Sequence, residues 1–541
     1  MKHSLAQKLA ESVVPQSAAA RRSAVATRSA VATQSAVARF VRSGTAPRTR
    51  RPTLPFLASA FLATALLLAL PSAGSAQIGT RFPSEKKIII DEVTGVPLTF
   101  LTSQPAGDSK IYQTHHQWTS DGQWLVFRSN RVPGQAMAVN EATGDLVQVT
   151  EAGYSGMLCL ATHSMNLYFL RSVTLPGEAV LPPPDVATIA AAGTPRSDGP
   201  SSGVAGASAA PAARGGTRGG GRGGRGGPRG PSQIIRVDLA KLFADSAAGT
   251  LQGSAAYEKI CGTVPPEFGA IGDVALDPTE DFVYLRVGSK ERAAQHLAPD
   301  TKAAPTFGPR NMGAGPTGLA SMNLKTGETK FIVAVPFQIG HVQTNPWVPG
   351  EIIFCWETGG KAPQRTWTVL ADGTGLRPLW PEAAYDWVTH EAVITKDEVA
   401  FAVMGHRQPG VNDDWGISGT REHPTGLGIV NLRTREMRFA GQTKSGSGLW
   451  HVHGSPDGRW AVGDDFERNI YLIDRRSDEM VLLSSDHKRT AADHPHPTFS
   501  TDSTRIQIQS AKLSADGRAM NICIIPVPEK LLQRTYSTKL N

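Results

Sequence analysis

Residues 455–465 read SPDGRWAVGDD, a polar Asp-Gly turn followed by a short, largely apolar run. This order is typical of a β-strand that begins directly after a tight turn. Six other stretches have the same form: TSDGQWLVFRSN (119–130), THSMNLYFLRS (162–172), DPTEDFVYLRVG (277–288), NPWVPGEIIFCWE (345–357), TKDEVAFAVMG (395–405) and STDSTRIQIQS (500–510). The chain therefore repeats one strand-forming unit seven times.

A second predicted hairpin, around a TG-type or charged turn, lies between most of these units. Its copies are NEATGDLVQVT (140–150), NLKTGETKFIV (323–333), LADGTGLRPLW (370–380), NLRTREMRFAG (431–441) and IDRRSDEMVLL (473–483). Two hairpins give four strands per unit, and most units start about 43 to 68 residues apart, which suits propeller blades. We predict an all-β, seven-bladed β-propeller. A β-sandwich, the alternative all-β fold, would not explain seven similar units.

The overall composition agrees with a turn-rich β protein. The 541 residues include 55 Gly and 38 Pro, which favours many turns over long helices. Only four cysteines are present, too few for a disulfide-stapled scaffold of this length. Cys159, Cys355 and Cys523 lie in apolar runs, so we expect them to be buried free thiols.

The N-terminal 76 residues have the form of an export signal. Arg48, Arg50 and Arg51 precede the uncharged stretch TLPFLASAFLATALLLALPSAGSA (53–76), and small residues precede a plausible cleavage site before Gln77. Residues 1–52 carry a net charge of +9 and the rest of the chain carries −1, so the total of +8 does not indicate a nucleic-acid partner. We expect residues 77–541 to form a periplasmic or secreted propeller that meets the membrane only through this signal. An uncleaved membrane anchor is the alternative.

One segment, 172–233, interrupts the repeats. It is rich in Ala, Gly, Ser and Pro and ends in ARGGTRGGGRGGRGGPRG (213–230). No hydrophobic core can form from this composition, so we predict a disordered, solvated insert.

Histidines recur just before the turn in five of the seven units. They lie in the segment Tyr112–His116 and at His341, His390, His451 and the pair His494 and His496. In a propeller this position belongs to the innermost strand, so the imidazoles of successive blades would meet at one end of the central channel. The pattern predicts a metal-binding or acid–base cluster there.

Several of these motifs together resemble the oligogalacturonate lyase family. The matching stretches are IGHVQTNP (339–346), FCWE (354–357), QRTW (364–367), VTHE (388–391), HVHGSPDGRWAVGDD (451–465) and HPHPTFSTDS (494–503). The resemblance implies a seven-bladed propeller with a manganese site at the channel mouth. It also implies the cleavage of short pectin fragments, which are acidic oligosaccharides, by β-elimination.

Position by position, the resemblance implies three metal ligands, namely His390, His494 and His496. The family has a glutamine three residues before the His-Pro-His pair, where this chain has Ala491. Asp493, His451 or water would then complete the coordination of the metal. Three imidazoles suit Mn, Fe, Ni or Zn better than Mg or Ca, and the resemblance favours Mn²⁺.

The resemblance also assigns the chemical step. His341 matches the family's proton-abstracting histidine, Arg365 matches an arginine that would hold a substrate carboxylate, and His451 matches a histidine that would bind substrate. The residue types suit such a reaction, because a cation neutralises the carboxylate next to the abstracted proton and a near-neutral histidine can act as the base.

Two other classes of propeller protein are alternatives to a lyase. A non-catalytic platform of the translocation-protein (TolB-like) class also repeats SPDG turns, and the alanine at position 491 keeps this reading open. A serine-peptidase propeller is excluded, because no hydrolase domain with a G-x-S-x-G motif follows the repeats.

Overall fold

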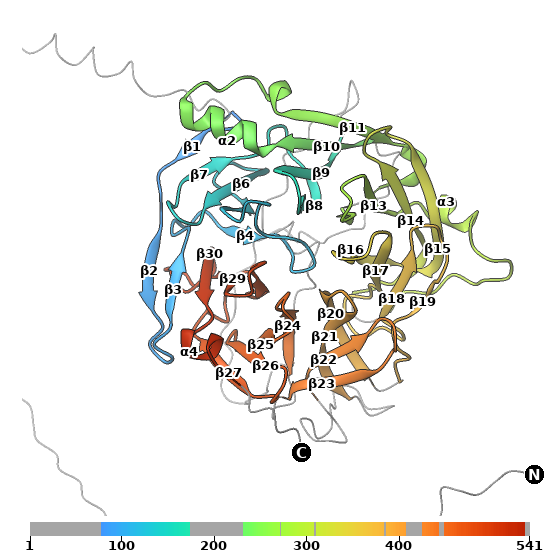
Figure 1. The fold of residues 1–541 in the computed structure, drawn as a ribbon. Coiled ribbons are helices and arrows are strands. Elements are labelled where there is room, and N and C mark those ends of the chain that lie inside the picture. Colours follow the sequence, from blue (N-terminus) through green and yellow to red (C-terminus); the bar gives the residue numbers. More distant parts are fainter. Residues whose placement is uncertain are drawn as a thin grey trace, which may run out of the picture. The chain divides into compact units, whose positions relative to one another are not determined.

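The computed structural model describes residues 77–173, 231–270, 272–307, 310–383, 386–406, 425–442 and 448–535. Residues 72–541 belong to one compact unit, in which seven antiparallel sheets are arranged radially as the blades of a β-propeller (Figure 1). The predicted fold is confirmed. The predicted signal, 1–76, lies outside the described residues.

The first four blades follow the chain from the centre outward, except for one added edge strand. Blade one contains β4 (Asp108–Lys110), β5 (Trp124–Ser129), β6 (Gln135–Asn140), β7 (Leu146–Gln148) and, at its edge, β1 (Arg81–Phe82). Blade two contains β8 (Ser155–Leu160), β9 (Asn166–Ser172), β10 (Ser232–Asp238) and β11 (Glu258–Val264). Blade three contains β12 (Val274–Leu276), β13 (Phe282–Val287), β14 (Ala314–Asn323) and β15 (Thr329–Phe337). Blade four contains β16 (Ile339–Thr344), β17 (Glu351–Trp356), β18 (Thr366–Leu370) and β19 (Arg377–Pro378).

The last three blades complete the ring. Blade five contains β20 (Asp386–Thr395), β21 (Glu398–His406), β22 (Gly426–Asn431) and β23 (Met437–Gln442). Blade six contains β24 (Leu449–Gly454), β25 (Trp460–Asp465), β26 (Ile470–Asp474) and β27 (Met480–Ser484). Blade seven contains β28 (Thr498–Phe499), β29 (Arg505–Ser510), β30 (Asn521–Pro526), β3 (Pro97–Phe100) and β2 (Lys87–Ile90).

Strands from the two ends of the chain close the ring. In blade seven, Thr99 of β3 pairs with Ile524 of β30, so the N-terminal strands complete the last blade. In blade one, Arg81 of β1 pairs with Val147 of β7. This pairing covers strand edges and fixes the first and last blades to each other.

The seven repeats seen in the sequence are the second strands of the blades, and the five further hairpins join third and fourth strands. The turn chemistry explains the motif. Ser455 Oγ donates to Asp457 Oδ1 at 2.5 Å, and the backbone N–H of Arg459 donates to the same oxygen at 3.0 Å. Gly458 has a φ of +71°, which favours glycine. The same Ser/Thr–Asp contact recurs at Thr119 and Asp121 and at Ser500 and Asp502.

Among the described residues, seven large hydrophobic clusters lie one between each pair of neighbouring blades, and a small eighth cluster contains Ala491, Ala511 and Met520. Successive residues of one strand enter different clusters: Val126 packs toward blade two, whereas Leu125 and Phe127 pack toward blade seven. A blade is covered on both faces, so its inner strands are buried throughout, as in β5. Cys159, Cys355 and Cys523 are buried free thiols, as expected.

The predicted insert joins the second and third strands of blade two. Ser172 pairs with Ser232, so the strands extend slightly into the predicted range 172–233, and residues 174–230 lie outside the described part. The helices are short: α2 (Leu239–Ala248), α3 (Lys290–Ala294), α4 (Glu529–Leu532) and the 3₁₀ turns Ser254–Ala256 and Pro266–Phe268. In the described residues no helix is long and apolar enough to cross a bilayer.

Candidate functional site

Irregular innermost strands aim the predicted site histidines at the channel. The pairing register shifts between Gly340 and Gln343 in β16, between Thr389 and Ala392 in β20, and between Leu449 and His451 in β24. His341, His390 and His496 also adopt left-handed backbone angles, with φ values of 50°, 55° and 50°. Such bulges re-aim side chains and are common beside functional sites.

Four of the predicted residues form one imidazole cluster around His451. The ring centre of His451 lies 4.2 Å from that of His390, 3.6 Å from that of His496 and 5.3 Å from that of His494. All four side chains are buried. The structure therefore brings together residues of blades five, six and seven that are up to 106 positions apart in the sequence.

Each imidazole of this cluster has its Nδ1 held by a partner. His390 Nδ1 lies 2.6 Å from the carbonyl oxygen of Trp450, and His496 Nδ1 lies 2.8 Å from Gln113 Oε1. Asp464 serves both His494, at 2.7 Å, and His451, at 3.2 Å. All four partner atoms are oxygen acceptors, so each Nδ1 is placed to donate a proton to its partner. Nε2 of His496 also faces an acceptor, Oδ2 of Asp493, at 3.0 Å.

The Nε2 atoms of His390 and His451 are buried and form no hydrogen bond within the described residues. Burial lowers the pKa of His390 well below its usual value and lowers the pKa of His451 to about 3. Neutral imidazoles with Nδ1 anchored and Nε2 free have the form that metal ligands take in proteins. The donor set therefore fits a divalent transition metal.

One group of convergent potential ligand atoms overlaps the predicted triad without being identical to it. Atoms of His451, Asp464 and His494 lie within 4.8 Å of one another. His390 and His496 flank this group through their contacts with His451. Ala491 is buried near Ala511 and Met520 and offers no ligand, whereas Asp493 Oδ2 lies 3.0 Å from His496 Nε2. Asp493 and His451, the expected substitutes for the missing glutamine, thus both lie beside His496.

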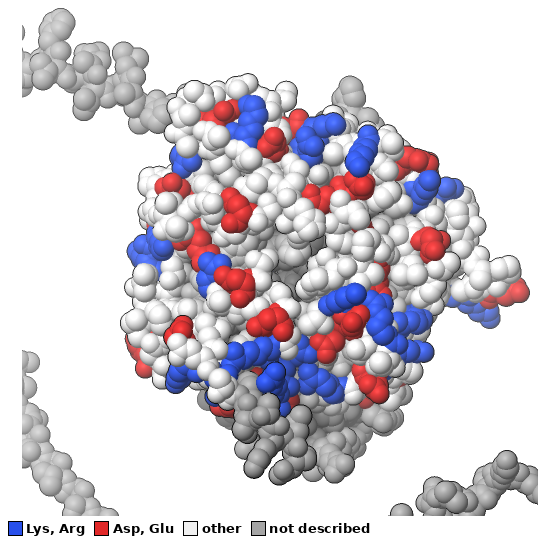
Figure 2. All heavy atoms as spheres, viewed as in Figure 1, with Lys and Arg blue, Asp and Glu red and all other residues white. Residues whose placement is uncertain are grey.

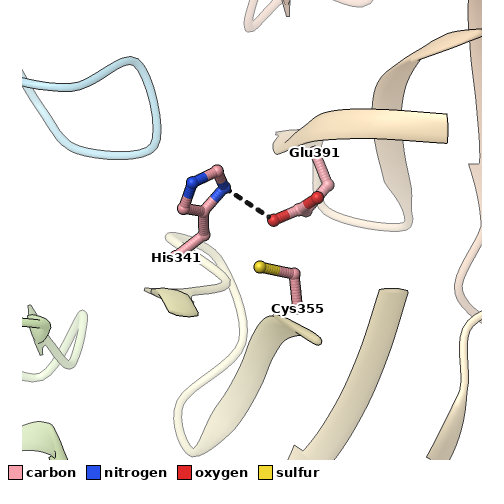
Figure 3. A group of neighbouring side chains, drawn as sticks. All are labelled: His341, Cys355 and Glu391. Carbon is pink, nitrogen blue, oxygen red and sulfur yellow. Dashed lines mark hydrogen bonds and ion pairs between the residues drawn. The ribbon is translucent and has the colours of Figure 1, made fainter. Parts of the chain in front are cut away.

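A second polar group surrounds His341 in blade four (Figure 3). Its Nδ1 lies 3.0 Å from Oε1 of Glu391, whose Oε2 accepts from Arg365 Nε at 3.1 Å. Glu357 Oε2 lies 3.4 Å from His341 Nε2 and 3.5 Å from Arg365 Nη2. The predicted base and the predicted carboxylate-binding arginine are therefore neighbours, linked by two carboxylates that sequence reasoning did not assign.

Charges in this second group set its protonation. Burial raises the pKa of Glu391, but Arg365 and His341 together bring it down to about 2. Burial lowers the pKa of His341, but the charge and hydrogen bond of Glu391 raise it above the usual 6.5 overall. Cys355 is a third potential ligand beside His341 and Glu391. Burial raises the pKa of its thiol well above the usual value, and a neutral thiol beside a guanidinium does not favour a metal.

Tyr112 links the two groups. Its ring centre lies 5.0 Å from that of His341 and 5.2 Å from that of His496. The hydroxyl is buried and has no hydrogen-bond partner in the described part of the chain. A buried hydroxyl without a partner is costly and points to a role with a bound molecule.

The sequence gives little indication that Glu391 and Asp464 belong to the site. Glu391 follows His390 directly, and strand alternation would place two adjacent residues on opposite faces. The bulge in β20 removes that expectation. Asp464 belongs to a Gly-Asp-Asp run in which nothing distinguishes it from Asp465. Only the positions of Glu391 in the VTHE motif and of Asp464 in the GDD motif distinguish them from other acidic residues.

The channel also contains a cavity of about 340 Å³ at the other ends of the innermost strands. Thr344, Ile394 and His453 are among the residues that line it. Gln113 lines it too and holds His496 from there. The face of the propeller seen in Figure 2 is hollowed at its centre. The imidazole cluster and this cavity thus lie along one channel.

Comparisons with known proteins give a consistent likeness of fold. By sequence, neither the protein-family models nor the curated proteins match this chain. By structure, it is similar to an oligogalacturonate lyase in complex with manganese, with a TM-score of 0.58, 18% identity, and coverage of 85% of this chain and 100% of that one. A second oligogalacturonate lyase, from Vibrio parahaemolyticus, gives a TM-score of 0.56, 16% identity, and coverage of 84% and 100%. The resemblance predicted from the motifs is confirmed as a shared seven-bladed propeller fold.

Proposed function

We propose that this protein is a metal-dependent lyase that cleaves oligogalacturonides or related oligouronides by β-elimination. The observation that carries the proposal is the imidazole cluster with anchored Nδ1 atoms, in which Nε2 of His390 and Nε2 of His451 have no hydrogen-bond partner among the described residues. This cluster lies beside a separate His–Glu–Arg group. The first group suits a metal and the second suits proton transfer. The likeness to oligogalacturonate lyases, one in complex with manganese, supports the same chemistry.

His390, His494 and His496 would hold the metal, which we propose to be Mn²⁺, with His451 and Asp493 close enough to contribute. When bound, such an ion would neutralise the substrate carboxylate and so acidify the neighbouring C–H bond. Asp464 keeps His494 and His451 in the tautomer that leaves Nε2 unprotonated. The anchored rings would need little reorganisation to bind the ion.

His341 would act as the base. Glu391 holds its Nδ1–H, so Nε2 is the atom that takes the proton from C5 of the uronide. The electron pair of that bond forms the C4–C5 double bond, and the bond from C4 to the glycosidic oxygen breaks with its electron pair on that oxygen, which takes a proton from solvent. Arg365 would hold the carboxylate next to C5, and its long contact of 3.5 Å to Glu357 is the one most easily exchanged for a substrate. His451 lies between the metal ligands and would contact the bound sugar.

The proposal is tested by incubating purified protein with Mn²⁺ and a panel of polyuronide fragments. A new ultraviolet absorbance from the unsaturated sugar, together with bound metal in elemental analysis, is the expected result. Absence of both metal and product would leave the non-catalytic binding platform as the better description.

We further propose that the protein acts outside the cytoplasm, in the periplasm or as a secreted enzyme, because residues 53–76 have the form of an export signal. N-terminal sequencing of protein from the native host should begin near Gln77. An intact N-terminus on a soluble cytoplasmic protein would contradict this placement.

A further inference from the structure

Arg128 occupies the register that carries site residues in other blades. It pairs with Ser109 of the innermost strand β4. Asp464 pairs in the same way with His451 of β24, and Cys355 pairs with Gly340 of β16. Second strands run back toward the end of the channel where innermost strands begin. Arg128 therefore lies at the same end of the channel as the histidine cluster, on blade one.

The guanidinium of Arg128 reaches across to the start of β8 in blade two. Its Nη2 donates to the carbonyl oxygen of Gly156 at 3.4 Å and contacts Met157 Sδ at 3.5 Å, and its Nε has no hydrogen-bond partner. The residue is only 5% exposed. Both contacts are long, and neither partner carries a charge. A donor set built for five hydrogen bonds is thus poorly satisfied at a buried position.

The charge of Arg128 is also not neutralised. Among the described residues no carboxylate lies within ion-pairing distance of it, whereas Arg365 is paired with Glu391 and Arg171 is paired with Glu258. Burial lowers the pKa of Arg128, and Tyr154 and then Asp493 oppose this shift. Asp493 also holds His496, so Arg128 lies on the metal side of the site. Buried charges are normally paired, and an unpaired one at a site end indicates an anionic ligand.

We propose that Arg128 binds the carboxylate of the sugar that leaves during elimination, one residue away from the sugar that loses its C5 proton. This inference rests on the proposed function, which supplies a substrate with one carboxylate per sugar. Arg365 and the metal site lie on blades four to seven and serve the first carboxylate. Arg128 supplies a cation from blade one for the second. The guanidinium fork matches a carboxylate with two parallel hydrogen bonds.

The test uses digalacturonate and the same disaccharide with a methyl ester on the leaving sugar. Wild type should bind the diacid more tightly than the ester. Arg128→Gln should bind both alike, because its KM for the diacid alone rises about 10- to 100-fold. Arg171→Gln is the matched control, because it removes a guanidinium from the same register in blade two that Glu258 already neutralises. It should keep the wild-type preference.

The outcomes separate this inference from the proposed function. If wild type neither cleaves nor binds digalacturonate or any other diuronide of the panel in calorimetry, the proposed function fails and the inference fails with it. If wild type cleaves it and Arg128→Gln keeps the wild-type preference for the diacid, the inference alone is overturned. Should Arg128→Gln not fold, Arg128→Met, which fills the buried position without a charge, decides: a reduced preference for the diacid supports carboxylate binding, and an unchanged preference rejects it.

Discussion

Oδ2 of Asp464 lies 2.7 Å from Nδ1 of His494. The same carboxylate also contacts the ring of His451 and accepts from its backbone N–H at 2.9 Å. Its charge thereby fixes the tautomer of two imidazoles at once. The pKa of Asp464, raised by burial, is brought far below its usual value by the two histidines.

Asp464→Asn should therefore weaken metal binding without removing any predicted ligand. The amide keeps the shape but cannot fix both tautomers, so we expect Mn²⁺ affinity to fall about 10- to 100-fold. Calorimetric titration of the metal-free protein measures it. Asp465→Asn, which changes a neighbouring carboxylate that holds Asn469 instead, is the control. Equal affinity in both variants would contradict the proposed anchoring.

Removal of a ligand should abolish tight metal binding rather than weaken it. We expect His494→Ala and His390→Ala to lose the metal in elemental analysis, and also to lose the rise in melting temperature that added Mn²⁺ gives the wild type. His296→Ala, an exposed histidine that stacks on Phe331, should retain both. Unchanged metal content in both ligand variants would reject the site.

Much of the fold could be predicted because it depends on local signals that repeat. A polar turn such as that at Asp457 sets the start of a strand, and the seven turn-and-strand repeats set the number of blades. The histidine register could be predicted for the same reason, since His341 and His390 recur at one place in the repeat. The carboxylates could not be predicted, because Glu391 and Asp464 reach the channel through bulges and cross-blade contacts that depend on the folded backbone.

His341→Ala should lower turnover by about 10²- to 10⁴-fold and keep the metal. The pH profile gives a sharper test. A base works deprotonated, so activity falls as the pH drops below its pKa. Burial lowers the pKa of His341 and Arg365 opposes protonation too, but Glu391 and Glu357 raise it above 6.5 overall. Glu391→Gln removes the main raising charge, so the acid limb of kcat/KM should move to lower pH while the maximal rate falls. An acid limb that stays in place would remove His341 from the role of base.

The raised pKa of Glu382 predicts a pH dependence of the stability of the fold that is separate from the pH dependence of catalysis. Its Oε1 accepts from the backbone N–H groups of Arg365 and Thr366, yet burial raises its pKa from 4.5 to about 7. The folded protein therefore holds this proton more tightly than the unfolded chain. The stability it contributes is full below pH 4.5 and is lost as the pH rises toward 7. Between pH 5 and pH 8 the wild type should lose more melting temperature than Glu382→Gln. Parallel losses would contradict the raised pKa.

Tyr112→Phe tests whether the buried hydroxyl of Tyr112 contributes to turnover without contributing to stability. The variant removes a buried hydroxyl that has no partner among the described residues, so the free energy of unfolding should stay unchanged or rise by up to about 1 kcal/mol. The ring remains and keeps its contacts with His341 and His496. If the hydroxyl faces the bound sugar between base and metal, turnover should fall about tenfold or more despite the unchanged stability.

Tyr168→Phe, which changes a tyrosine buried in the core between blades two and three, should leave turnover intact. Both quantities are measured on the same preparations, by chemical denaturation and by product absorbance. A Tyr112→Phe protein that is as stable and as active as wild type would show that the space between His341 and His496 does not hold the reacting sugar.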